Sequence, residues 1–230
     1  SAFAGVGGIG FTLTDVSFGA VMVSTTGPTP VNYMALKAGA GSASLGGIPG
    51  LTAVIRDLSV VVNKTSSMTP HTTVLDFAAT AGNATDNTAA SRSISTGPSS
   101  PAVTMDVDGD EGVLLQVASA LTLDVFGFVT LDGSFSFKKA TGNFVLTNAS
   151  THTSTTLTGV NYLEVGAQVG SAFAGVGGIG FNLTDVSFAA VMVSTTGPTP
   201  VTYMAMRAAV GSASSVGISW LTATVSSLSV

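Results

Sequence analysis

The chain has 230 residues, of which 45% are hydrophobic and only 8% are Asp, Glu, Lys or Arg, against roughly 25% charged residues in an ordinary soluble domain. Its seven basic residues are scattered among twelve acidic ones, which excludes an electropositive stripe for nucleic acid. Cysteine is absent, so disulfides, thiolate chemistry and Cys-ligated zinc are excluded as well. No run of about 18 apolar residues occurs, and we expect no transmembrane helix.

A long internal repeat dominates the sequence. Residues 1–60 return without a gap at 171–230, with 45 of 60 positions identical. Solenoid units repeat every ~20 to 50 residues, so an offset of 170 residues indicates a tandem array of domain-sized modules. We interpret 1–64 as the C-terminal part of one module and 65–112 as a Ser/Thr-rich, loop-like segment with an acidic turn. Residues 113–170 are then the N-terminal part of the next β module, followed by the second copy, and we expect the chain to be a window of a longer array.

The first strands are predicted on both sides of a Gly-rich turn. Residues 5–10, GVGGIG, match the GxGxxG spacing of a dinucleotide-binding loop. An alternating, β-branched stretch follows instead of a helix, so we predict a turn between strands and no cofactor. The apolar phase then slips by one residue, which predicts a bulge near Thr14 and Asp15. TTGPTP at 25–30 predicts the next turn.

Two further features precede the acidic turn. The strand predicted over 51–64 carries Arg56 and Asp57, and both become serine in the second copy, which predicts that they compensate each other on an exposed face. Within the polar stretch that follows, VLDFA at 74–78 is a candidate short edge strand.

Residues 121–139 carry the clearest strand pattern. Gly127 predicts a kink or tight turn inside this stretch, because about 17 residues is long for one strand. We expect an antiparallel sheet with one face in the core and the other in water. The apolar residues that share one parity are Leu121, Leu123, Val125, Val129, Leu131, Phe135 and Phe137.

The acidic turn is the candidate metal site. Asp106, Asp108 and Asp110 alternate along it and Glu111 is adjacent, an arrangement that can present oxygens to Ca²⁺. The EF-hand pattern fails, because its twelfth position is valine. Asp108-Gly109 equally predicts a plain hairpin turn between VTMDV and VLLQV.

No stretch has the 3.6-residue apolar period of an amphipathic helix, so the predicted fold is all-β. We expect an elongated antiparallel meander or β-solenoid-like sheet, curved or coiled, that is built from tandem repeats. A sheet that continues from one module to the next would leave few strand edges unpaired.

Three stretches resemble the repeat units of very large bacterial surface or secreted proteins, described as giant repeat, adhesin-like or calcium-binding-like proteins. They are SALTLDVFGFVTLDGSFSF, SAFAGVGGIGFTLTDVSFG and ALKAGAGSASLGGIPGLT. The resemblance covers most of the chain except 65–105. It implies an extracellular or cell-surface structural role and brings no catalytic residues.

These observations favour a non-catalytic module of a long extracellular fibre or adhesin stalk, whose partners are copies of itself or neighbouring modules. A Ca²⁺- or carbohydrate-binding adhesin module, with glycans as partners, is the alternative. An outer-membrane β-barrel is a weaker one, since three Tyr and one Trp are few for aromatic girdles. We expect no enzyme: His71 and His152 lie in separate polar loops, and GxSxG, HExxH and P-loop motifs are absent.

Overall fold

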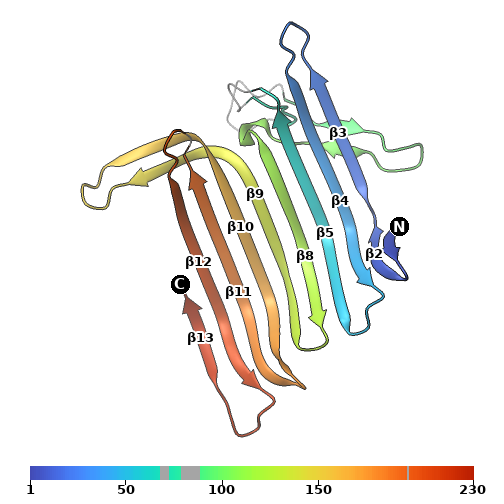
Figure 1. The fold of residues 1–230 in the computed structure, drawn as a ribbon, viewed down its shortest axis with the longest axis vertical. Helices are drawn as coiled ribbons and strands as arrows, with labels where there is room; N and C mark the ends of the chain where they lie inside the picture. The colour runs from blue at the N-terminus through green and yellow to red at the C-terminus, as the bar shows by residue number, and fades with distance from the viewer. Residues whose placement is uncertain (68–72, 79–88, 196) are drawn as a thin grey trace.

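The computed structural model describes residues 1–67, 73–78, 89–195 and 197–230 (Figure 1). Among them, an eleven-stranded sheet and a two-stranded ribbon account for all strands. The sheet strands are β1 Ala2–Val6, β2 Ile9–Thr14, β3 Ser17–Ser24, β4 Asn32–Gly46, β5 Leu51–Thr65, β8 Leu114–Val125, β9 Val129–Thr147, β10 Ser154–Val176, β11 Ile179–Ser194, β12 Thr202–Val216 and β13 Thr224–Ser229. The ribbon is β6 Arg92–Ile94 with β7 Val103–Met105, and a 3-10 turn, η1 Gly109–Glu111, follows it.

The large sheet is an open antiparallel meander. Its strand order is β1-β2-β4-β5-β8-β9-β10-β11-β12-β13, and β3 continues the line of β2 along the same side of β4. The two ends of the chain lie at the two ends of this row (Figure 1). The prediction of an elongated all-β antiparallel meander is therefore confirmed.

The two sequence copies lie six strands apart in this one sheet. Strands β4 and β12 are 170 residues apart and pair in the same way with the strand before them, since Val21 faces Ala35 and Val191 faces Ala205. Strand β5, in the C-terminal part of one module, pairs with β8, in the N-terminal part of the next, from Leu51–Val125 to Asn63–Leu114. The sheet thus continues across the repeat boundary.

The predicted turns are present. Gly7 and Gly8, with φ of 63° and 83°, join β1 to β2, so GVGGIG is a strand turn. Gly127, at φ 69°, lies in the tight turn between β8 and β9, because a left-handed backbone suits glycine.

The strand is irregular near Thr14 and Asp15 but has no bulge there, so the prediction of a bulge was wrong. The strand is interrupted there, and Asp15 has φ 51°. However, Thr14 pairs with Ser42 and Ser17 pairs with Gly39, so two residues separate the pairs on both strands. The backbone turns at Asp15 without the extra residue that defines a bulge.

The core lies on a different face from the one predicted. The alternate apolar residues of β8 and β9, Leu121 and Phe135 among them, are only partly buried, and Phe137 is 36% exposed. The buried cluster includes Ala35, Leu114 and, from outside the large sheet, Met105. Leu114 and Leu121 are seven residues apart on one strand, so their side chains lie on opposite faces. We call the face that carries Ala35 and Leu114 the covered face.

What covers this face is the predicted loop-like segment. We call residues 73–78 and 89–112 the cover segment. Residues 74–78 form no strand, which corrects the prediction of an edge strand. Instead, Leu75 and Phe77 pack against the buried cluster, together with Ile94 and Val103 of the ribbon. The lone histidine His71 lies outside the described residues.

Candidate functional site

The acidic turn is the end of the cover segment, between β7 and β8. Strand β7 pairs with β6 and not with β8, so the predicted hairpin between VTMDV and VLLQV was wrong. A 3-10 turn stands in its place, and Asp108 caps it, since its Oδ1 accepts a hydrogen bond from the Asp110 backbone N–H at 2.9 Å. The Gly109 N–H donates to Asp76 Oδ1 at 2.8 Å, which adds a carboxylate that the sequence did not indicate.

Two of the four predicted carboxylates pair with lysines of the sheet. Asp106 Oδ1 lies 2.5 Å from Lys37 Nζ on β4, and Glu111 Oε2 lies 2.6 Å from Lys138 Nζ on β9. The partners are 69 residues apart for Lys37 and Asp106. No local spacing pattern could have indicated these partners.

The pair of Lys138 and Glu111 lies beside Tyr162, and the pKa values of Lys138 and Tyr162 are both raised. Burial lowers the pKa of Lys138, but the hydrogen bonds and negative charge offered by Glu111 and Tyr162 outweigh it, so this pKa lies above its ordinary value. Burial raises the pKa of the Tyr162 hydroxyl more than the neighbouring Lys138 charge lowers it. The Tyr162 ring also packs edge-on against Phe144, with 5.2 Å between the ring centres.

The described residues contain no group of three or more His, Cys, Asp or Glu side chains arranged to hold a metal ion. Asp106 and Glu111 extend to different lysines on different strands, as the ion pairs show. A Ca²⁺ site formed by Asp106, Asp108, Asp110 and Glu111 stays a prediction, which a calorimetric titration of the chain with Ca²⁺ tests.

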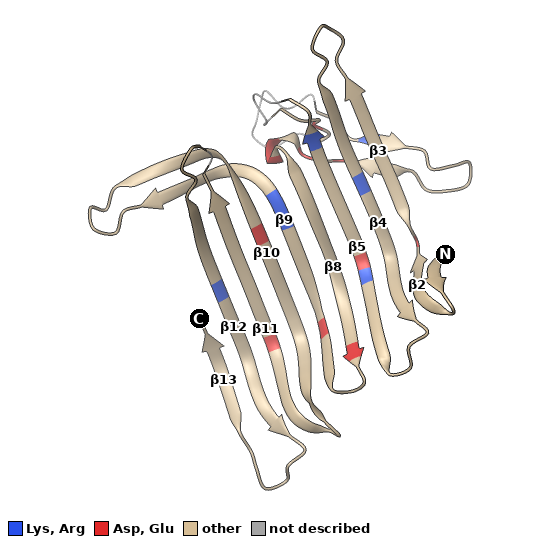
Figure 2. Cartoon of the chain, in the orientation of Figure 1, with Lys and Arg blue, Asp and Glu red and all other residues tan. Residues whose placement is uncertain are grey.

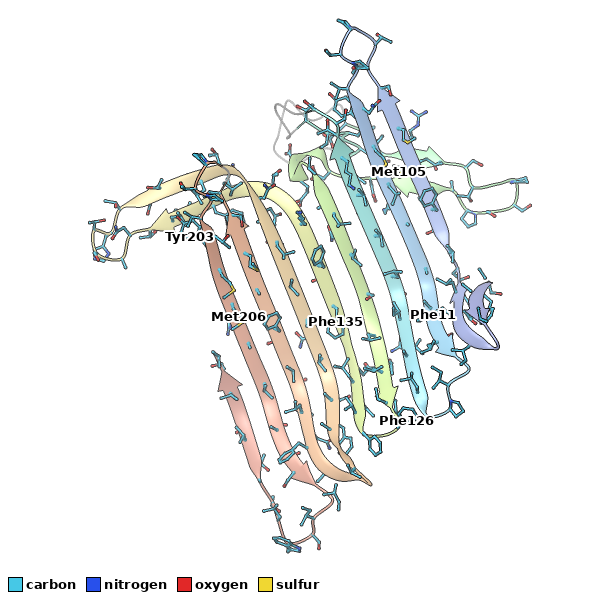
Figure 3. All side chains as sticks on the ribbon, in the orientation of Figure 1. Phe11, Met105, Phe126, Phe135, Tyr203 and Met206 are labelled. Atoms are coloured by element: carbon cyan, nitrogen blue, oxygen red, sulfur yellow. The ribbon has the colours of Figure 1, made fainter. Side chains whose placement is uncertain are left out.

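Apolar contacts fix the cover segment above β3 and β4. Met105 and Ala35 are both 0% exposed, and Val103 Cγ1 would lie 2.9 Å from a Cβ placed on Gly19. Figure 3 shows Met105 beside β3 and β4. The Asn63 side chain, also 0% exposed, donates through Nδ2 to the Leu75 carbonyl at 2.7 Å. The cover segment is therefore packed on the sheet through apolar contacts, hydrogen bonds and the two ion pairs.

Beyond the cover segment the same face is open. A furrow of about 660 Å³ crosses the sheet from Asp57 on β5 to Arg207 on β12. Its floor consists mainly of Ala, Ser and Gly residues from β8 to β11. Its charged lining residues are Asp57 and Arg207, one at each end.

Charged residues are sparse on the strands, and the adjacent ones are Arg56 and Asp57 on β5 and Lys138 and Lys139 on β9 (Figure 2). The predicted compensation between Arg56 and Asp57 was wrong. Arg56 Nη2 donates to Thr122 Oγ1 at 2.7 Å and lies 3.3 Å from Asp132 Oδ2, whereas Asp57 lines the furrow. Asp57, at φ 53°, lies where the pairing of β5 with β8 shifts register.

No family model, curated protein or solved structure matches this chain. Among the described residues, none of the helical segments has the length and apolar character required to cross a membrane.

Proposed function

We propose that this chain is a structural repeat module of a long extracellular fibre or adhesin stalk, which spaces or assembles rather than catalyses. The observation that carries the proposal is the single sheet that passes through both sequence copies, in which β5 of one module pairs with β8 of the next. A module that ended at its own boundary would close its sheet there. In this chain the sheet instead continues from one module into the next, so each module has a strand that pairs with its neighbour.

The surface supports the same role. Only 8% of the residues are charged, so there is little electrostatic repulsion between copies. Many large apolar side chains are exposed on this single-layer sheet, including Phe18, Met22 and Trp220 at 58%, 75% and 84%. Such surfaces favour association, and edge-to-edge stacking would satisfy the unpaired backbone groups of the outer strands.

Electron microscopy of a chain with several repeats tests the proposal. We expect unbranched filaments or rods whose length grows with the number of repeats. Each 170-residue repeat contributes six strands about 4.8 Å apart, so each should add about 29 Å. Compact particles whose longest dimension does not grow with repeat number would contradict the proposal.

Thermal unfolding gives an independent test. Modules that share a sheet stabilise one another through their interfaces, so three repeats should melt at a higher temperature than one. Equal melting temperatures for one and three repeats would count against stacking.

A further inference from the structure

The outermost strands of the sheet are copies of inner strands. Among the described residues, β1 pairs only with β2, and β13 pairs only with β12. Strand β13, residues 224–229, aligns with residues 54–59 of β5, and β1 aligns with residues 172–176 of β10. The inner copies therefore show which strand each outer edge fits.

The inner partner of the β13 sequence is β8. In β5, Val54 faces Thr122, Ile55 faces Leu121 and Arg56 faces Ala120. Transferred by 170 residues, this register places Ser226 of β13 opposite an Ala120-type residue.

The inner partner of the β1 sequence is β9. In β10, Ala172 faces Leu131 and Ala174 faces Val129, and the Gly175 N–H donates to the Phe128 carbonyl at 2.8 Å. The corresponding residues of β1 are Ala2, Ala4 and Gly5.

The two edges are thus not partners of each other, since one fits β8 and the other fits β9. Strands β8 and β9 form one hairpin, paired from Leu115–Lys139 to Val125–Val129. From these pairings we propose that a β8–β9 hairpin of another repeat docks between the β13 edge of one copy and the β1 edge of the next, in the register found inside the sheet. This inference rests on the proposed function, because it specifies how stacking modules meet.

The tip of the hairpin supplies a second contact and a built-in reporter. The Phe126 N–H donates to the Gly50 carbonyl at 2.6 Å, and the Phe126 ring lies against Gly50. Figure 3 shows Phe126 at the turn between β8 and β9. In the second copy Trp220, the only tryptophan of the chain, takes the place of Gly50 and is 84% exposed. A hairpin on the β13 edge would bring its phenylalanine onto this indole.

The second copy differs at several positions along this edge, and two of them change the contacts described above. Ser226 replaces Arg56, so the contacts that Arg56 makes with Thr122 and Asp132 are lost there. A Cβ on Gly50 would lie 2.6 Å from the Phe126 ring, so the docked turn must shift to admit Trp220. Because neither change removes a backbone donor or acceptor of β13, the ladder can still form.

A disulfide test reads the register directly, because the chain has no cysteine of its own. Residues 61–147 are joined to Val230, which aligns with Val60, so that a second hairpin follows in cis. Ser226→Cys is combined with Ala120→Cys in the appended hairpin. Directly paired residues lie about 4.5 to 5.5 Å apart between Cα atoms, within disulfide range. We expect this pair to oxidise, and the Trp220 emission to shift to shorter wavelength relative to the 230-residue chain.

The matched control moves one cysteine by one residue. Leu121→Cys in the appended hairpin, combined with Ser226→Cys, places the thiols on opposite faces and should give little disulfide. Similar oxidation of both pairs, or none of either together with unshifted Trp220 emission, would overturn the proposed docking. The same two cysteine pairs are also tested with a peptide of residues 113–147 added to the 230-residue chain, so that misfolding of the extended chain does not decide the result.

The outcome is separable from that of the proposed function. Filaments from multi-repeat chains without the predicted disulfide would retain stacking and reject this register. Compact multi-repeat particles that nevertheless form the predicted disulfide would retain the register and reject the fibre.

Discussion

The two copies of the repeat have nearly the same sequence but different surroundings. Ala35 on β4 is 0% exposed, whereas its counterpart Ala205 on β12 is exposed, and Gly19 is buried where Ala189 is exposed. Two neighbours account for the difference. The cover segment lies on β3 and β4, and β5 pairs along β4 as far as Tyr33. In a single-layer sheet, burial is therefore decided by what the rest of the chain places on a strand.

The largest effect should come from a polar substitution at the two equivalent alanines. Ala35→Asn adds atoms to a filled site beneath the cover segment and buries an amide without a prepared partner, so we expect a loss of about 4 kcal/mol of unfolding free energy. Ala205→Asn is the matched control and should change it by less than about 0.5 kcal/mol. Urea denaturation of both variants measures this. Equal losses would mean that the copies do not differ in burial.

A smaller loss is expected from the cover segment itself. Met105→Ala removes a fully buried side chain from the cluster that contains Ala35 and should cost about 3 kcal/mol. Met206, 53% exposed on β12, is the control, and Met206→Ala should cost less than about 1 kcal/mol. Urea midpoints that fall by the same amount in both variants would contradict the packing of the cover segment.

Local pattern predicted the strands and turns but not the cover segment. Alternation and β-branched residues indicate strands. Gly7, Gly8 and Gly127 lie in turns because their positive φ angles favour glycine, and a glycine is visible in the sequence. The pairing of Lys37 with Asp106 depends instead on two segments, 69 residues apart in the sequence, that meet on one face of the sheet. Arg56 likewise finds Asp132, 76 residues away, rather than its neighbour.

The prediction of which sheet face forms the core was wrong for the same reason, because it depends on a distant segment. The parity of Leu121 and Phe135 is more apolar than that of Leu114, yet the cover segment lies on the Leu114 face. Alternation shows that two faces differ, but which face is buried depends on where a distant segment packs. The candidate carboxylates are visible in the sequence as an acidic turn, whereas the lysine partners of Asp106 and Glu111 lie on distant strands and could not be predicted from local spacing.

The two copies also differ at Gly19, whose counterpart is Ala189, and a substitution there should have an intermediate effect. A Cβ on Gly19 would approach Val103 Cγ1 to 2.9 Å, so Gly19→Ala should destabilise the chain by about 1 kcal/mol, although alanine usually improves a strand. In a Val103→Ala background the Cγ1 contact is removed and the Val103 Cβ remains at 3.2 Å, so the same substitution should cost less than in the wild-type chain. A double-mutant cycle in urea measures the coupling. An effect of Gly19→Ala that is the same in both backgrounds would rule out this contact.

The smallest effect should appear at alkaline pH, at the ion pair that attaches the cover segment to β9. The pKa of Lys138 and that of Tyr162 both lie above their ordinary values of 10.5 and 10.0 in the folded chain. Their contribution to stability is therefore complete below about pH 10 and is lost as the pH rises through the raised values. Arginine remains protonated in this range, so Lys138→Arg should reduce the loss, and Tyr162→Phe should remove the part due to the hydroxyl. Urea unfolding between pH 8 and about 11.5 measures the slope. Since the cover segment packs on β3 and β4 and pairs with Lys138 on β9, hydrogen exchange should show the alkaline loosening at β4 and β9 before β12. Simultaneous loosening of all three strands would place its origin elsewhere.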